Sequence, residues 1–193
     1  MIGLDFDNTL VDYTAAFQEE AALLGLSLPG ASKTRIRDTL RLQPNGELLW
    51  QRLQARVYGP AISRAQVMPG ARAFLDTCRA RGIGVSIVSH KSRFAAQDPG
   101  GVDLREAATT WLRSNDIGVP EANVFFEGTR REKIKRIDAL RCTFFVDDLT
   151  EVLLDPAFPK STQRLWFVTA GEKAAPPIAM AGDWRQIARH VFG

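Results

Sequence analysis

The sequence predicts an α/β fold: a doubly wound, Rossmann-like parallel sheet of five strands, with a small helical cap inserted after the first strand. Two observations predict it. Short apolar segments alternate with segments of helical periodicity along most of the chain, and this alternation is typical of βαβ units, whose parallel strands are covered by helices on both faces. After the first strand, however, a long interval contains helical patterns alone, which predicts an insert.

Five apolar segments predict the strands of the sheet. The first of them ends in acidic residues, as expected of a buried strand that delivers polar groups at its C-terminal end. The predicted strands are 2–6, 83–88, 124–126, 143–146 and 164–168.

Four helical segments alternate with these strands. The pattern is clear in 104–114, where Leu104, Ala108 and Trp111 share one face. Asp103 precedes this segment and is its expected N-cap. The other three segments are 71–81, 132–140 and 183–191.

The interval 12–68 contains no convincing strand and is too long for a simple crossover. We therefore expect two domains, an α/β core made of 1–11 and 69–193 and a helical cap made of 12–68. Helical spacing predicts three cap helices, 13–24, 32–42 and 47–58.

Composition excludes several classes of protein. The 193 residues are 45% hydrophobic and carry a formal net charge of +3, which fits a globular chain and lacks the dense basic charge of a nucleic-acid binder. The two cysteines have no partners at zinc spacing. No apolar run reaches the length of a membrane span, and Met1 leads directly into the first strand without a signal peptide. We expect a cytoplasmic enzyme that binds neither nucleic acid nor membrane.

Polar side chains cluster where the predicted strands end. Because ligands bind at the carboxyl ends of the strands in open α/β sheets, we expect these side chains to share one crevice. Their carboxylates would repel one another unless a cation lay between them, and oxygen ligands without Cys or clustered His favour Mg²⁺. Acids, a hydroxyl, a lysine and a cation together suit phosphoryl transfer. The residues are Asp5, Asp7, Ser89, Lys133, Asp147 and Asp148.

These motifs resemble the haloacid dehalogenase (HAD) superfamily of hydrolases, most of whose members are phosphatases. The first motif, Asp-x-Asp-x-Thr, matches residues 5–9, directly after an apolar strand. The second, a hydroxyl residue that ends an apolar strand, matches Ser89. The third matches Lys133, with Lys135 as the competing candidate, and the fourth, an acidic pair after an apolar strand, matches 147–148. The four motifs occur in the family's order, and 12–68 occupies the position of the family's type-one cap.

The resemblance implies a mechanism and a role for each residue. Asp5 would be the nucleophile that forms an aspartyl-phosphate, and Asp7 would be the general acid and then the general base. Ser89 and Lys133 would bind phosphoryl oxygens, and the backbone N–H groups of Phe6, Asp7 and His90 would add donors. Thr9 would orient the first loop. The Mg²⁺ ligands would be Asp5, the backbone carbonyl of Asp7, and Asp147 or Asp148.

The expected partner is a small phosphorylated metabolite, because a cap of this size encloses a small molecule more easily than a phosphoprotein. Phosphotransfer to a second substrate, as in a phosphomutase, remains open. A nucleotidase is a narrower alternative that would need an aromatic side chain of the cap, Trp50 or Tyr58, to stack on a base. A non-catalytic binding module is a third. The sequence does not specify the oligomeric state.

Overall fold

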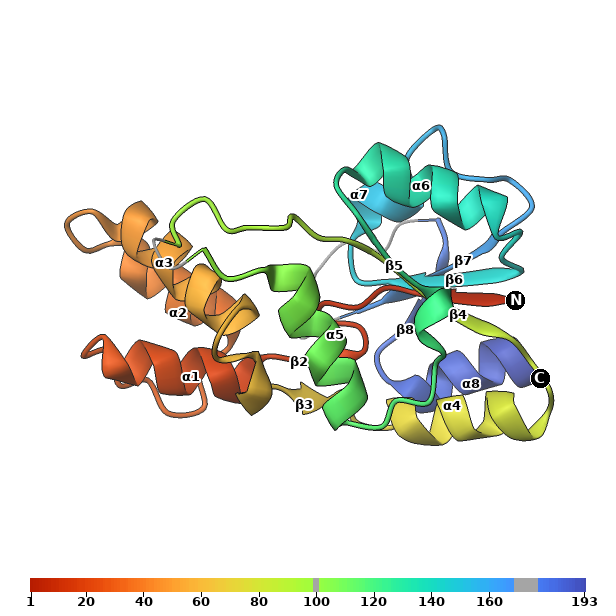
Figure 1. The fold of residues 1–193 in the computed structure, drawn as a ribbon, viewed down its shortest axis with the longest axis horizontal. Helices are drawn as coiled ribbons and strands as arrows, with labels where there is room; N and C mark the ends of the chain where they lie inside the picture. The colour runs from red at the N-terminus through yellow and green to blue at the C-terminus, as the bar shows by residue number, and fades with distance from the viewer. Residues whose placement is uncertain (99–100, 169–176) are drawn as a thin grey trace. The chain divides into compact units, whose positions relative to one another are not determined.

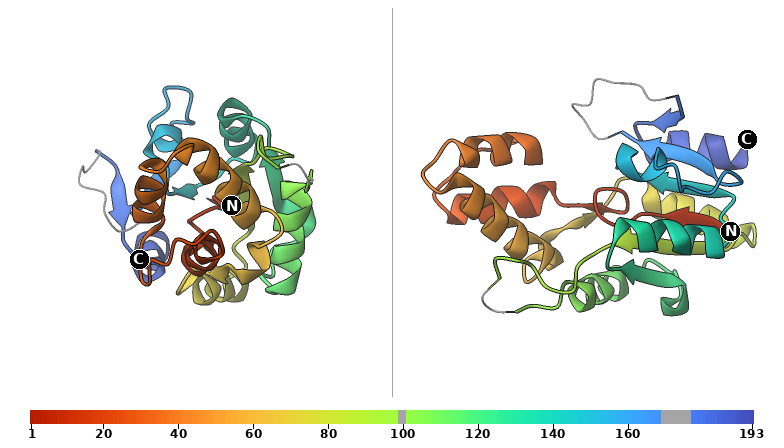
Figure 2. Two further views of the ribbon diagram at one scale, coloured as in Figure 1. Left: turned by 90° about the vertical axis from the view of Figure 1, so that its left-hand side faces the viewer. Right: turned by 90° about the horizontal axis from the view of Figure 1, so that it is seen from above.

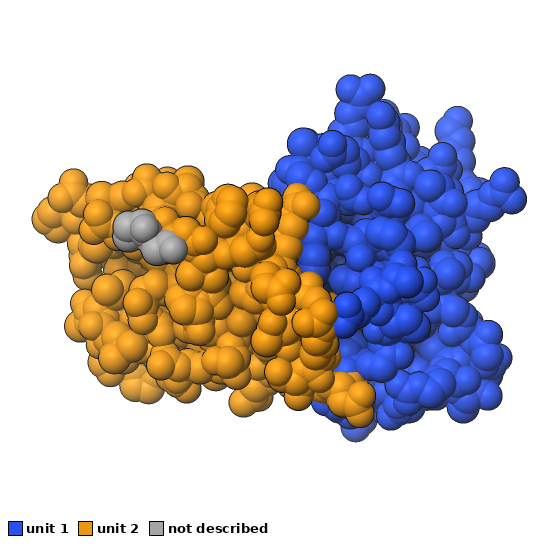
Figure 3. Space-filling view, viewed as in Figure 1, with its two compact units in different colours: residues 1–11, 67–91, 117–193 blue, residues 12–66, 92–116 orange. Residues whose placement is uncertain are grey.

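The structure is a computed structural model of the 193-residue chain, and it describes residues 1–98, 101–168 and 177–193. Contacts within the chain divide it into two compact units (Figure 3). Unit 1 comprises 1–11, 67–91 and 117–193, and unit 2 comprises 12–66 and 92–116.

Unit 1 is built on a six-stranded sheet in the order β5-β4-β1-β6-β7-β8, and its neighbouring strands pair in parallel. The strand β1 therefore lies between β4 and β6. From β1 the chain first builds one half of the sheet, β4 and β5, and then the other half, β6, β7 and β8. The strands are β1 (Ile2–Leu4), β4 (Val85–His90), β5 (Val124–Glu127), β6 (Phe144–Asp147), β7 (Gln163–Phe167) and β8 (Ala179–Ala181).

The predicted α/β class is confirmed, but the predicted number of five strands is wrong. The sixth strand, β8, pairs only with β7 and lies at the edge of the sheet. Two of its three residues are exposed. An edge strand of this length buries too little apolar surface to leave a recognisable pattern in the sequence.

Helices cover both faces of this sheet: α6 (Arg130–Ala139) and α7 (Thr150–Leu153) lie on one face, and α4 (Ala71–Ala80) and α8 (Trp184–Phe192) on the other (Figures 1 and 2). On the α6 side, Ile134 packs into a buried cluster with Val88 and Phe145. On the other side, the rings of Phe74 and Trp184 lie 4.9 Å apart. A short 3₁₀ helix, η2 (Glu121–Asn123), precedes β5.

Unit 2 is helical and contains α1 (Thr14–Leu23), α2 (Lys33–Arg41), α3 (Gly46–Tyr58), the 3₁₀ helix η1 (Ile62–Arg64) and α5 (Leu104–Ser114). The three cap helices predicted from the sequence are present to within one residue at each end. Two short strands, β2 (Val11–Asp12) and β3 (Gln66–Val67), form a two-stranded sheet at the ends of the insert. The periodicity of the sequence did not predict them, because two residues are too few to show alternation.

The segment 92–116 belongs to unit 2, whereas the sequence places it in the α/β core. Its helix α5 packs against η1 and α3, and the indole Nε1 of the buried Trp111 donates a hydrogen bond to the carbonyl of Ala65 at 3.0 Å. Chain order suggested a crossover helix lying on the sheet. The apolar face of α5 is instead buried against the insert.

Side-chain caps position several helices. Asp103 accepts hydrogen bonds from the backbone N–H groups of Arg105 and Glu106 at the start of α5, as the sequence predicts. Thr129 accepts one from Glu132 at the start of α6, and each such cap satisfies a backbone donor that the helix leaves unpaired. Among the described residues, no helix is long and apolar enough to cross a membrane.

Candidate active site

The predicted site residues of unit 1 converge at the carboxyl ends of β4, β1 and β6. Asp5 directly follows β1, and its backbone N–H donates to the carbonyl of Val146 on the neighbouring strand at 2.9 Å. Asp147 is the last residue of β6, and Ser89 lies one residue before the end of β4. This edge of the sheet lies beside the central strand, where the direction of the fold reverses and ligands bind in open α/β sheets.

A buried lysine joins two of these acids. The Nζ of Lys133 lies 2.6 Å from a carboxylate oxygen of Asp5 and 2.6 Å from one of Asp147. All three side chains are at least 94% buried. Lys133 reaches them from the first turns of α6, whereas Lys135 on the same helix is exposed. Of the two lysines left open by the sequence, Lys133 is the one at the acids.

Asp147 and Asp148 are held by different groups. The second oxygen of Asp147 accepts the backbone N–H of Leu149 at 3.0 Å. Asp148 accepts a hydrogen bond from the side-chain amide of Asn8 at 3.1 Å. Asn8 has a left-handed backbone, with φ of 59°, a conformation that Asn tolerates better than most residues. The indole of Trp166 donates to the Asp148 carbonyl at 3.1 Å.

The negative charges of the buried acids exceed the positive charge placed among them. The pKa of Asp5 is raised to about 7, chiefly by burial, with Lys133 opposing the rise and Asp147 and Asp7 adding to it. Burial likewise raises the pKa of Asp148 to about 8, reinforced by the negative charges of Asp5 and Asp147. Burial lowers the pKa of Lys133, but Asp147 and Asp5 outweigh it, so the net shift is upward and the lysine stays charged. One ammonium does not neutralise this many buried carboxylates.

Asp7 lies beside a second lysine. The Nζ of Lys91 approaches both oxygens of the Asp7 carboxylate, at 3.0 and 2.9 Å. The Asp7 side chain is 22% exposed and that of Lys91 only 4%. Lys91 directly follows the predicted residues Ser89 and His90, and the structure shows that it forms an ion pair with Asp7.

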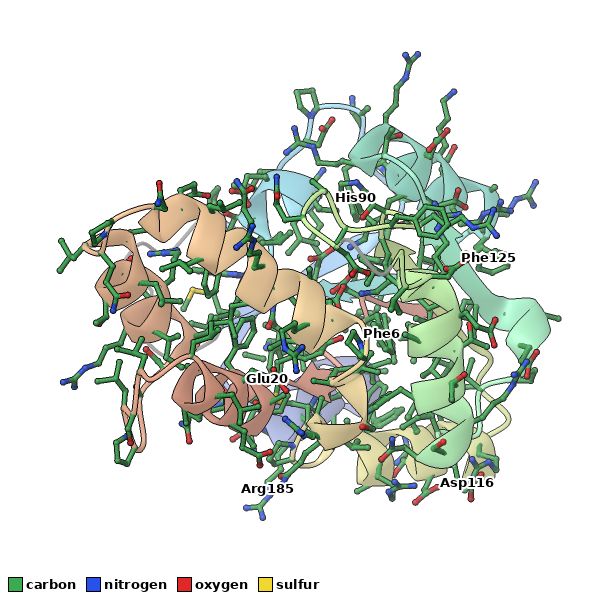
Figure 4. All side chains as sticks on the ribbon, turned by 60° about the vertical axis from the view of Figure 1, so that its left-hand side comes forward. Phe6, Glu20, His90, Asp116, Phe125 and Arg185 are labelled. Carbon is green, nitrogen blue, oxygen red and sulfur yellow. The ribbon has the colours of Figure 1, made fainter. Side chains whose placement is uncertain are left out.

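The other predicted phosphate-binding residues have varied surroundings. Ser89 is buried in β4. Thr9 is also buried, and its hydroxyl lacks a hydrogen-bond partner among the described residues. The ring of Phe6 packs edge-on against that of Phe126. The His90 side chain is exposed, with its Nε2 3.1 Å from the carbonyl of Gly128 (Figure 4).

Sequence reasoning gave Asn8 no role and did not pair Lys91 with Asp7. Asn8 occupies a variable position inside the first motif, so nothing in the pattern marked it. A signal existed for Lys91, because it follows a buried strand whose carboxyl end already supplies Ser89. A lysine at such a place faces the same crevice as the strand-end acids.

The helical insert of unit 2 carries arginines that could bind an anion, and these are Arg35, Arg37, Arg41, Arg52, Arg56 and Arg64. Arg56 and Arg64 both contact the buried carboxylate of Glu20. The side chain of Arg52 forms no hydrogen bond or ion pair with the described residues. It lines an open cavity of about 690 Å³ with Arg56, Ala55, Pro60 and residues 96–98, all within unit 2. Arg52 is therefore the member of this set best placed to bind an anion.

The donor set of unit 1 fits a hard divalent cation. Asp5, Asp147 and Asp148 each offer an oxygen, and these three atoms lie within 4.8 Å of one another. No other such group of acidic, His or Cys side chains is found among the described residues. Oxygen donors of this kind suit Mg²⁺ better than zinc, and the pKa values of Asp5 and Asp148 are raised by burial first and by the neighbouring carboxylates second.

Comparison with solved structures identifies the fold. No family model and no curated protein matches the chain. A HAD family hydrolase from Deinococcus radiodurans R1, with bound phosphate and sodium, superposes with a TM-score of 0.60 at 13% identity, over 98% of this chain and 93% of that one. A predicted phosphoglycolate phosphatase from Haemophilus somnus 129PT matches with a TM-score of 0.56 at 16% identity, over 99% and 97% of the two chains.

This chain has the HAD-superfamily fold. The resemblance inferred from the four sequence motifs is thus confirmed at the level of architecture. At these identities the likeness establishes architecture alone. Protein Tyrosine Kinase A from Mycobacterium tuberculosis matches equally well, with a TM-score of 0.59 at 14% identity over 100% and 97% of the chains. The chemistry of this HAD-fold chain must therefore be argued from its own site.

Proposed function

We propose that the chain is a Mg²⁺-dependent phosphatase that hydrolyses a small phosphomonoester through an aspartyl-phosphate on Asp5. The observation that carries the proposal is the contact of one buried lysine with both Asp5 and Asp147, beside Asp148. A carboxylate, a fixed cation and a set of oxygen donors for a metal ion are the groups that phosphoryl transfer requires. The match to the four HAD motifs supports the same reaction.

The balance of charge supports the divalent cation. Three carboxylates, those of Asp5, Asp147 and Asp148, lie together around one ammonium group, that of Lys133. The difference between three negative charges and one positive charge is the charge of one Mg²⁺. When bound, Mg²⁺ would neutralise charge on the carboxylates and on the phosphoryl oxygens.

The reaction would then run in two displacements. An oxygen of Asp5 attacks phosphorus, the bond from phosphorus to the ester oxygen breaks, and Asp7 gives its proton to the departing alkoxide. Asp7, now a carboxylate, takes a proton from a water molecule, which attacks the phosphorus of the aspartyl-phosphate. The bond to Asp5 breaks and inorganic phosphate leaves. Lys133 keeps Asp5 in place and offers positive charge to the phosphoryl group.

A panel of phosphate monoesters, assayed for released phosphate with Mg²⁺ and with EDTA, tests the proposal. We expect turnover that requires Mg²⁺ and falls by at least about 10⁴-fold in Asp5→Asn, because the amide is a poor nucleophile. Asp138→Asn, an exposed acid on α6, is the matched control and should retain wild-type activity. Turnover that survives Asp5→Asn would exclude the covalent route.

Transfer of the phosphoryl group to an acceptor other than water is a second candidate, favoured by the likeness to the protein described as a tyrosine kinase. The first displacement would be the same, and only the attacking group of the second would differ. Adding sugars or alcohols as acceptors to the same assay distinguishes the two. Phosphorylated acceptor in place of free phosphate would identify a transferase.

A further inference from the structure

The pair formed by Lys91 and Asp7 sets this site apart from a simple cluster of acids and one lysine. Lys91 approaches both oxygens of one carboxylate, at 3.0 and 2.9 Å, whereas Lys133 approaches one oxygen on each of two acids. The two lysines therefore act on different acids. Lys133 joins Asp5 to Asp147, and Lys91 serves Asp7.

Lys91 is itself held rigidly. Its backbone N–H donates to the carbonyl of Glu127 at 3.0 Å, which extends the pairing of β4 with β5 by one residue. Its ammonium lies 5.4 Å from the centre of the Phe6 ring, a distance typical of cation–π contact. With only 4% of its side chain exposed, Lys91 has little freedom to move away from Asp7.

From this geometry we propose that Lys91 is a positioning residue, which holds the Asp7 side chain in one orientation, so that its carboxyl group, when protonated, can give its proton to the leaving group. The inference rests on the proposed function. The Asp7 side chain is partly exposed, and an unrestrained carboxylate rotates freely about its last torsion. Proton transfer requires the donor oxygen within hydrogen-bond distance of the ester oxygen. A lysine that contacts both carboxylate oxygens limits that rotation.

This role predicts a defect that depends on the leaving group. A poor leaving group such as phenolate needs the proton from Asp7, whereas 4-nitrophenolate departs readily without it. Both esters carry the same ring and phosphate, so a general loss of structure or of Mg²⁺ would affect them alike. The parameter to compare is kcat/KM, because it reports on the first displacement and omits hydrolysis of the aspartyl-phosphate.

The experiment measures kcat/KM for phenyl phosphate and 4-nitrophenyl phosphate in wild type, Lys91→Met and Lys91→Arg. We expect Lys91→Met to lose at least about 10-fold on phenyl phosphate and less than about 3-fold on 4-nitrophenyl phosphate, since general acid catalysis contributes about 10²–10⁴-fold. Lys91→Arg should recover much of the loss, because a guanidinium also binds both oxygens of a carboxylate. Lys135→Met, an exposed lysine of α6, is the control and should leave both values unchanged.

A double-mutant cycle gives a second, independent readout. If Lys91 acts through Asp7, then adding Lys91→Met to Asp7→Asn should cost nothing further on phenyl phosphate. Equal losses on the two esters, or additive losses in the cycle, would overturn the inference. Thermal unfolding of each variant identifies one that fails to fold, in which case Lys91→Gln replaces Lys91→Met with the same expectation.

The outcomes separate this inference from the proposed function. If wild type hydrolyses both esters and Asp5→Asn hydrolyses neither, the function stands whatever Lys91 does. If the ratio of the two kcat/KM values is then unchanged in Lys91→Met, the positioning role alone is wrong. If wild type hydrolyses neither ester nor any other of the panel, both proposals fail together.

Discussion

Each of the two units buries a carboxylate against basic side chains, but with opposite balances of charge. In unit 2, Glu20 is 1% exposed and contacts two guanidiniums, those of Arg56 and Arg64 (Figure 4). The two arginine side chains remain 53% and 42% exposed. In unit 1, acids outnumber lysines, and Lys133, Asp5 and Asp147 are all nearly fully buried.

The difference shows which cluster is structural and which is poised to bind. Glu20 has more positive charge around it than it needs, and its partners keep contact with water, so the cluster is complete without a ligand. The acids of unit 1 have less positive charge around them, and burial together with their mutual repulsion raises the pKa values of Asp5 and Asp148. Buried acids with perturbed pKa values are typical of functional sites, where a bound ligand supplies the compensating positive charge.

The largest expected effect comes from removing the central charged group of each cluster, which is the Lys133 ammonium in unit 1 and the Glu20 carboxylate in unit 2. In EDTA, Lys133→Met should lower the free energy of unfolding by about 3–5 kcal/mol, because it leaves Asp5 and Asp147 buried without their partner. Glu20→Gln should cost only about 1–2 kcal/mol, since the half-exposed arginines can be hydrated and the amide still accepts a hydrogen bond. Urea denaturation measures both.

Solution pH provides a check on this contrast. Protonation of Asp5 or Asp148 relieves the charge left by Lys133→Met, so the deficit of that variant should be smaller at about pH 5 than at about pH 8. Equal losses for the two variants at both pH values would mean that the clusters do not differ in kind.

A smaller effect is expected on the melting temperature of the wild-type protein, which should depend on pH and on Mg²⁺. The pKa values of Asp5 and Asp148 are raised in the folded state, to about 7 and about 8, so the folded protein retains protons that the unfolded chain loses above about pH 4. Their contribution to stability is therefore complete below about pH 4 and is lost as the pH rises to about 8. In EDTA we expect the melting temperature to fall across this range.

Mg²⁺ should reverse that loss, and should raise the melting temperature more at about pH 8 than at about pH 5, because it binds the ionised carboxylates. Scanning calorimetry with EDTA and with Mg²⁺ measures both trends. The control is Asp5→Asn, which removes one of the titrating groups and should flatten the pH dependence in EDTA. A slope as steep as that of wild type would rule out Asp5 as its source.

The smallest expected effect compares one helix cap from each unit. Thr129 caps α6 and Ser32 caps α2, each by accepting one backbone N–H. Replacing either with Ala should cost about 1 kcal/mol. Only Thr129→Ala should also lower turnover, by a few-fold, because the first turns of α6 carry Lys133 to the acids. Loss of activity in Ser32→Ala to the same degree would show that stability alone accounts for the effect.

Much of the candidate site was predictable because its residues lie next to strongly patterned strands. Asp5 and Asp147 each follow or end a buried apolar segment, so their positions at one edge of a parallel sheet follow from general rules of α/β folds. Lys133 could not be separated from Lys135 in this way. Both belong to the same charged stretch, and only the rotation of α6, set by the burial of Ile134 and Ile137, determines which lysine points inward.

By itself the sequence determined the α/β class, the insert after the first strand, and the acids that share one edge of the sheet. These depend on local periodicity and on residues adjacent in the chain, which a single sequence displays. Tertiary structure decided the sixth strand at the sheet edge, the place of α5 in unit 2, and the pairing of Lys91 with Asp7 across 84 positions. Such pairings depend on how faces pack together, and no local pattern encodes which buried lysine meets which acid.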